Sequence, residues 1–234
     1  TITQQLARTL LRAGDIQKAA REFQRAADLL PDDVPLQVEA GKILVAAGQA
    51  DNAGGLARKL LARDPRNVEA QVLLANSLAG LRDLEGAVGA IEHAVEMDPT
   101  RSLSYANLGI LQLTHGQPDR AEEAFRTAIG MDPSSAPARL GLATLLWASG
   151  RFDEAAANLQ AVLEVEPRNL LAARALAALY LETGRPALAE PYLVAAAGAS
   201  QATGPRVMLA DYYIAQGRTA DALRVLDETA GLPG

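Results

Sequence analysis

The stretch GQPDRAEEAFRTAIGMDP, residues 116–133, carries the signals of one complete helix with a defined start and end. Gly116 permits the left-handed turn before the helix, and Pro118 falls early in the helix, where a missing N–H costs little. Ala121 and Phe125 lie four residues apart and therefore share one helical face. Pro133 stops the helix because its ring and missing donor block another turn.

The same signals recur every 34 residues along the chain. A glycine marks most of the turns, and Arg82 stands where the third glycine would be. An alanine follows five residues after each turn position, and a seventh unit is one residue short in phase. The repeated positions are prolines 31, 65, 99, 133 and 167, glycines 14, 48, 116, 150, 184 and 217, and alanines 19, 53, 87, 121, 155, 189 and 222. Internal repetition of this length predicts an array of stacked structural units.

Each repeated position has a physical reason. A polar residue after the turn, such as Asp15 or Asp83, is expected to start the second helix of each unit. The alanine is expected where two helices cross closely. A bulky residue follows it by four in most units: Phe23, Ile91, Phe125, Leu159, Leu193 and Leu226. The first helices repeat a core residue followed by a small one, at Leu6, Ala40, Leu74, Leu108, Leu142, Leu176 and Leu209.

Together, the 34-residue period, the turn glycine, the alanine and the closing proline resemble the tetratricopeptide repeat family, with seven repeats. The resemblance implies an all-α, right-handed superhelical α-solenoid of antiparallel helix pairs. One solenoid domain is expected over 1–234, in units 1–33, 34–67, 68–101, 102–135, 136–169, 170–202 and 203–234. The sequence departs from the family at the large aromatic residue near the start of each first helix, which predicts shallower packing there. The residues at this place are Thr3, Gln37, Gln71, Tyr105, Arg139, Ala173 and Arg206.

The family resemblance also implies that the first helices line a concave groove. The groove positions in the first three units are mixed, whereas those in the last four are mostly apolar. The apolar set predicts a surface for a partner segment, a partner helix or another copy of the chain. An alternative is that these side chains only cover neighbouring units. The candidate groove residues are Leu103, Ile110, Leu113, Leu140, Trp147, Leu171, Leu181 and Ile214.

Both terminal units carry apolar residues that a neighbouring unit would normally cover. Either further repeats or domains lie beyond the ends, or each end is covered by another copy, or the chain is a monomer with frayed ends. A head-to-tail contact of the second kind builds a helical filament or tube unless it closes into a ring. The candidate self-association residues are Ile2, Leu6, Ala13, Leu223, Leu226 and Ala230.

Composition limits the remaining functions. The net charge of −6 argues against nucleic-acid binding, and no apolar run is long enough to span a membrane. Cysteine is absent, and His93 and His115 are isolated, so no catalytic residue, metal site or cofactor is expected. The sequence therefore predicts a non-enzymatic, bacterial-type interaction scaffold, or alternatively a self-assembling structural subunit. The cell compartment is left open, because a cysteine-free chain suits the cytoplasm, the periplasm or the extracellular space.

Overall fold

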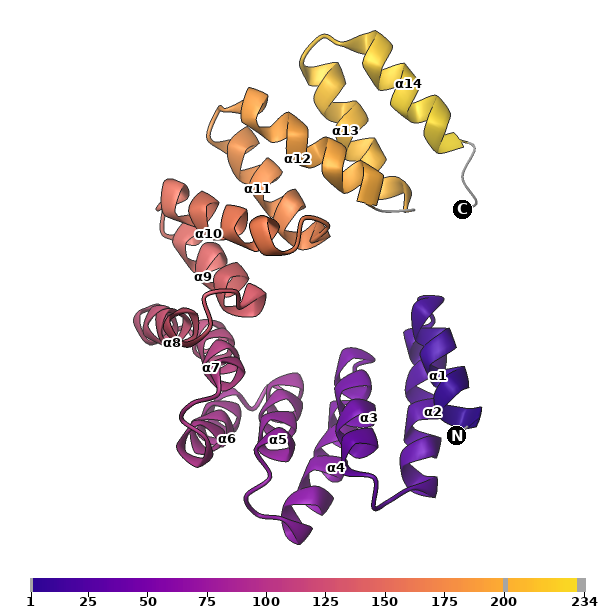
Figure 1. Cartoon of the computed structure of the whole chain (residues 1–234), viewed down its shortest axis with the longest axis vertical. Helices are drawn as coiled ribbons and strands as arrows, with labels where there is room; N and C mark the ends of the chain where they lie inside the picture. The colour runs from indigo at the N-terminus through magenta and orange to yellow at the C-terminus, as the bar shows by residue number, and fades with distance from the viewer. Residues whose placement is uncertain (1, 200–201, 231–234) are drawn as a thin grey trace. The chain divides into compact units, whose positions relative to one another are not determined.

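The computed structural model describes residues 2–199 and 202–230, and this part of the chain is all helical apart from short turns. It contains fourteen α-helices, drawn in Figure 1. They are α1 (Ile2–Arg12), α2 (Ile16–Leu29), α3 (Val34–Ala46), α4 (Ala50–Arg63), α5 (Val68–Gly80), α6 (Leu84–Met97), α7 (Ser102–Thr114), α8 (Pro118–Met131), α9 (Ala136–Ala148), α10 (Phe152–Val165), α11 (Leu170–Glu182), α12 (Pro186–Ala199), α13 (Thr203–Ala215) and α14 (Thr219–Ala230). The predicted all-α array of seven antiparallel helix pairs is confirmed.

The chain divides into two compact units: residues 1–131, with α1–α8, and residues 132–234, with α9–α14. We call them unit 1 and unit 2. Within each unit, every helix packs against the next one along the chain. In unit 1, the first helices α3, α5 and α7 also touch one another in succession, and Figure 1 shows them along one side, with α4, α6 and α8 on the other. The expectation of one solenoid over the whole chain stays a prediction.

A left-handed residue ends the first helix of every pair. Six of these residues are the glycines of the repeat, with φ between +69° and +80°, and the seventh is Arg82, with φ +67°. At Arg82, the backbone N–H of Asp83 donates to the carbonyl of Leu78, and that of Arg82 donates to Ala79, both at 3.0 Å. This pair of hydrogen bonds is a Schellman motif, which favours glycine at the left-handed position. The turn positions predicted from the sequence are confirmed, including the one at Arg82.

Replacing Arg82 by glycine is expected to stabilise the protein. A side chain in the left-handed region costs about 1–2 kcal/mol, and the greater freedom of glycine in the unfolded chain offsets part of this gain. The Arg82 side chain is exposed, and no hydrogen bond or ion pair within the described residues would be lost. Arg82→Gly should raise the free energy of unfolding in guanidinium by about 0.5–1 kcal/mol, and Arg82→Ala should not. A glycine variant no more stable than the alanine variant would contradict this explanation of the turn.

Asp15 and Asp83 start α2 and α6 in the predicted way. The Asp15 carboxylate accepts a hydrogen bond from the Lys18 backbone N–H at 3.1 Å, and the Asp83 carboxylate accepts one from Gly86 at 2.9 Å. Each bond satisfies an amide that the first turn of a helix leaves without a backbone partner. Pro118 and Pro186 are the first residues of α8 and α12.

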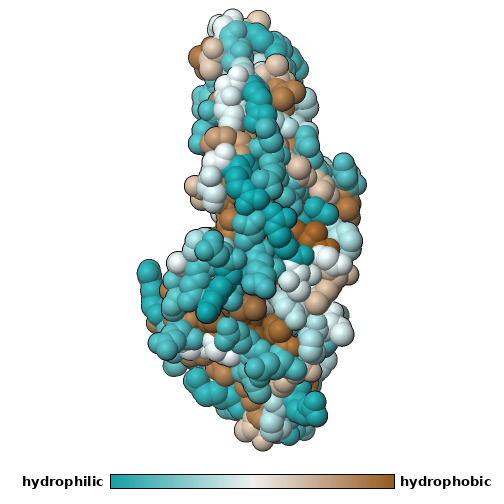
Figure 2. Space-filling model, turned by 90° about the vertical axis from the view of Figure 1, so that its left-hand side faces the viewer, coloured by the Kyte–Doolittle hydropathy of each residue, from teal (hydrophilic) through white to brown (hydrophobic). Residues whose placement is uncertain are grey.

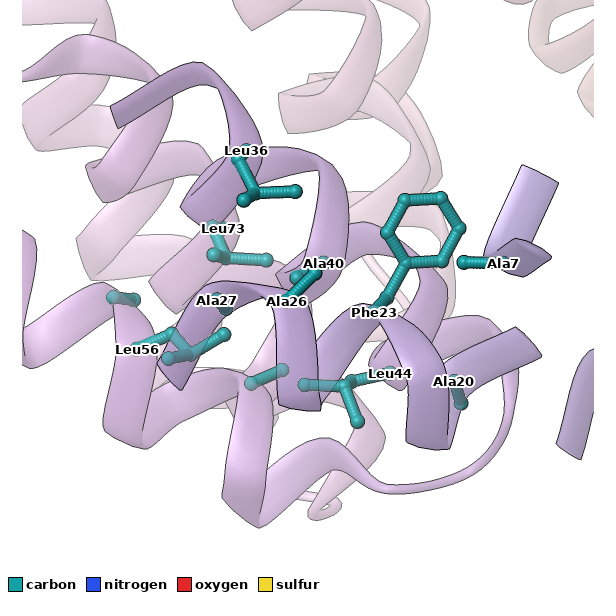
Figure 3. Packing of buried hydrophobic residues seen from close by; sticks show 12 residues of the cluster. Ala7, Ala20, Phe23, Ala26, Ala27, Leu36, Ala40, Leu44, Leu56 and Leu73 are labelled. Carbon is teal, nitrogen blue, oxygen red and sulfur yellow. The ribbon is translucent and has the colours of Figure 1, made fainter. Parts of the chain in front are cut away.

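The repeat alanines are buried, as expected for residues at close helix crossings. Six of them, from Ala19 to Ala189, are fully buried, and Ala222 is 2% exposed. Phe23 and Phe125, four residues after an alanine, are also fully buried, and Figure 3 shows Phe23 within its cluster of leucines and alanines. Leu6 and Leu226 hold core positions in the repeat register but are exposed, because they lie on α1 and α14, the outermost helices of their units.

The large aromatic residue that the family usually has near the start of the first helix is absent here, and shallow packing was expected in its place. Two of the residues at this position are buried instead. Gln37 is 5% exposed, and its amide nitrogen donates to the carbonyls of Ala27 at 2.6 Å and Leu30 at 3.0 Å. Ala173 is 3% exposed. The expectation of shallow packing is therefore wrong at α3 and α11. A glutamine can replace the ring at α3 because its amide satisfies carbonyls at the end of α2.

Candidate functional site

Ion pairs join successive first helices in unit 1. The Arg8 guanidinium on α1 binds the Glu39 carboxylate on α3 with both Nε and Nη2, at 3.2 and 2.8 Å. Arg101, just before α7, donates from Nη1 to Glu69 on α5 at 2.7 Å, and this hydrogen bond lowers the pKa of the Glu69 carboxyl. These pairs hold charged side chains of neighbouring first helices next to each other.

A hollow of about 450 Å³ lies on the same face, between α3 and α5. Val34, Pro35 and Val38 form its apolar part. Lys42 also lines the hollow, and it is exposed with no ion pair to any described residue. The face over α1, α3 and α5 is therefore mixed apolar and charged, in agreement with the pattern of the sequence. On α7, Leu103 and Ile110 are exposed at 41% and 42%, whereas Leu113 is half-buried.

Unit 2 carries the larger share of the predicted groove residues. Leu171 and Leu181 on α11 are 68% and 40% exposed, and Ile214 on α13 is 56% exposed. Leu140 and Trp147 on α9 are half-buried. The predicted line of eight groove residues thus forms two sets, Leu103, Ile110 and Leu113 in unit 1 and Leu140, Trp147, Leu171, Leu181 and Ile214 in unit 2.

Trp147 has a structural partner. Its indole N–H donates to the Glu182 carboxylate at the end of α11, at 3.0 Å. This bond ties α9 to α11 and holds the indole in a defined orientation. Contacts inside unit 2 therefore explain part of the role of Trp147. They do not explain Leu171, which is 68% exposed.

The predicted self-association residues are exposed where the structure describes them. Ile2 and Leu6 on α1 are 85% and 47% exposed, and Ala13 is also exposed. Leu223 and Leu226 on α14 are 57% and 38% exposed. The side chain of Ala230 lies outside the described residues.

An arginine after the turn glycine links successive helix pairs in unit 2, a contact that was not predicted from the sequence. Arg185 binds Asp153 on α10 at 2.8 Å, and its guanidinium lies 5.2 Å from the centre of the Tyr180 ring. Arg218 binds Glu190 on α12 at 2.7 Å, and its hydrogen bonds to Glu190 and Asp221 raise its pKa. The signal was the repeated Gly-Arg dipeptide at 150–151, 184–185 and 217–218.

The structure offers no arrangement typical of a metal site or a membrane span in its described part. Among these residues, no group of three or more His, Asp or Glu side chains is placed to hold a metal ion. None of the described helices combines the length and the apolar content needed to cross a bilayer. On the face shown in Figure 2, hydrophilic residues cover most of the surface and hydrophobic ones form only small patches.

A family profile described as tetratricopeptide repeat matches residues 44–108, 112–179 and 146–207, which is most of the chain. The chain belongs to the tetratricopeptide repeat family. Two further profiles of the same description match residues 5–54 and 204–228. Family and fold together identify this tetratricopeptide repeat chain as a scaffold for protein–protein interaction, the general role of a family that is mostly non-enzymatic. No curated protein matches the chain by sequence.

Solved structures share the fold at low identity. TTC0263, a tetratricopeptide repeat protein of Thermus thermophilus, is 24% identical with a TM-score of 0.68, over 76% of this chain and 97% of its own. The type IV pilus biogenesis factor PilW is 18% identical with a TM-score of 0.68, over 83% of this chain and 90% of its own. YrrB, described as having an unusual peptide-binding site, is 19% identical with a TM-score of 0.52, over 80% of this chain and 96% of its own.

Proposed function

We propose that the first helices of unit 2 bind an apolar segment of a partner protein. The observation that carries this proposal is the exposure of Leu171, Leu181 and Ile214, while neighbours such as Ala172 and Tyr213 on the same helices are buried. Full burial of one such side chain contributes about 1.5–3 kcal/mol. Three exposed anchors that the repeat core does not need therefore favour a binding surface over a purely structural one.

The partner segment is an amphipathic helix. Arg174 and Asp211 are exposed among the apolar groove residues of α11 and α13, and neither has an ion pair to another described residue. A helix with apolar residues at i, i+3 or i+4 and i+7, flanked by charges of both signs, matches such a surface. The peptide-binding site described for YrrB supports a peptide as the class of ligand.

A selection from a library of helical peptides tests the proposal. Peptides displayed on phage and selected on the purified chain should carry the i, i+3 or i+4, i+7 apolar pattern. They should bind weakly to Leu171→Asp and normally to Leu188→Asp, since Leu188 on α12 is 49% exposed but lies on a second helix. Peptides that lose binding equally to both variants would place the site elsewhere.

Self-association is a second candidate function, because apolar side chains are exposed on both α1 and α14. The double variant Leu223→Asp with Leu226→Asp replaces two of these apolar side chains with charged ones, which an apolar interface does not tolerate. If the chain assembles, this variant should shift its mass in light scattering to that of a monomer. Assembly that survives both substitutions, or a wild-type chain that is monomeric at high concentration, would rule out this contact.

A further inference from the structure

A polar hollow of about 360 Å³ lies away from the groove residues, between the second helices α6 and α8. Glu92 on α6 and Glu123 on α8 line it, together with Tyr105 and Gln112 on α7. Its volume falls within the range of about 300–1,000 Å³ that is usual for small-ligand sites. The hollow belongs entirely to unit 1 and is independent of the proposed groove function.

Three acceptor groups at the hollow have no hydrogen bond or ion pair from any described residue. Gln112 is only 5% exposed, and its side-chain oxygen is buried without a hydrogen-bond partner. A buried amide oxygen without a donor is unusual in proteins and costs free energy. Glu92 and Glu123 are exposed, and no ion pair to a described residue neutralises either carboxylate. The hollow therefore offers three acceptor groups that no described residue engages, beside the guanidinium donors of Arg120.

The charges around the hollow sum to −1. Glu92 and Glu123 each contribute one negative charge, and Arg120 on α8 contributes one positive charge without an ion pair in the described part of the chain. The half-buried Tyr105 adds an aromatic ring, whose face attracts a cation. The complementary ligand is thus cationic and carries several N–H donors.

We propose that this hollow binds a primary alkylammonium group, either a lysine side chain of a protein or a free amine. An ammonium group has three N–H donors and no acceptor. These donors match the two carboxylates and the Gln112 amide oxygen, which a rotation of the terminal amide brings toward the ligand. A carboxylate ligand would leave all three acceptors without donors and would meet two like charges.

NMR titration with defined probes tests the site. The probes are Nα-acetyl-L-lysine N-methylamide and n-butylammonium, and the neutral control is the same capped lysine acetylated on Nε. The methyl groups of Leu108, Ala124 and Thr127, which line the hollow, should shift saturably with both amines and not with the acetylated control. Tighter binding of the capped lysine would assign the site to a protein lysine, and tighter binding of n-butylammonium to a free amine.

Charge variants give effects of opposite sign. Glu92→Gln and Glu123→Gln should each weaken binding about two- to fivefold, and Arg120→Gln should strengthen it by a similar factor. Glu85→Gln changes an exposed carboxylate on α6 outside the hollow and should leave binding unchanged. All four residues are exposed, so the variants should fold, which circular dichroism checks. Equal shifts with the acetylated probe, no saturable shift with either amine, or weaker binding to Arg120→Gln would each overturn the proposal.

Discussion

Replacing Phe125 by alanine is expected to lower the free energy of unfolding by about 3–5 kcal/mol. The ring is fully buried on α8, where it packs against Gly109 on α7. Its removal leaves a cavity that rigid neighbouring helices cannot close. Chemical denaturation of the purified variant measures the loss, and a loss below about 1 kcal/mol would contradict the burial of the ring.

Gly109 tests the same contact from the other side. A Cβ at this position would lie 2.7 Å from the Cδ1 and Cε1 atoms of the Phe125 ring, closer than real contacts allow. Gly109→Ala should therefore destabilise by about 1–3 kcal/mol, although alanine is the better helix former. The effect should shrink in a Phe125→Leu background, because leucine lacks the ring edge. The control Gly89→Ala should stabilise, because no atom of the described residues that could obstruct it lies within 4 Å of the added Cβ. Strictly additive effects of the two changes would mean that Gly109 does not serve the ring.

The double variant Leu171→Asp with Ile214→Asp is expected to weaken binding of a selected helical peptide at least about thirtyfold, the effect of losing one hot spot of about 2 kcal/mol. Both side chains are among the most exposed apolar residues of unit 2, and aspartate would place a charge in an apolar contact. Isothermal titration calorimetry measures the affinity, and circular dichroism should show unchanged helicity because both residues are exposed.

Trp147→Ala should have a smaller effect on the same peptide. The indole is half-buried and already bound to Glu182, so part of its surface is not offered to a ligand. A control at Leu188→Asp should keep the wild-type affinity. If Trp147→Ala weakens binding more than the double aspartate variant does, the centre of the site lies on α9 rather than on α11 and α13.

The repeat register was readable from the sequence because each of its positions is constrained locally. A left-handed turn favours glycine, a helix stop favours proline, and a close helix crossing favours alanine. Because every repeat unit has the same three features, these residues recur along the chain. Even the departure at Arg82 was visible, since its neighbours hold the register. The start and end of α8 followed from the same signals.

The burial of each candidate groove residue could not be predicted from the sequence in the same way. Leu103 and Leu171 occupy equivalent positions in the repeat, yet the first is 41% exposed and the second is 68% exposed. The exposure of such a residue depends on the neighbouring helix, which the repeat pattern does not describe. The burial of Gln37 and the unpaired oxygen of Gln112 were hidden for the same reason, because both depend on contacts between pairs.

Site-specific photo-crosslinking tests the central claim, that the first helices of unit 2 hold a segment of a partner protein. A crosslinking amino acid is placed at 171 or 214, or at 188 as the matched control, in cells that express the chain, and the adducts are mapped by mass spectrometry. We predict that positions 171 and 214 capture the same helical segment of one partner and that position 188 does not. Adducts at 171 and 214 that contain only a second copy of the chain, or an adduct at 188 with the same segment, would contradict the claim.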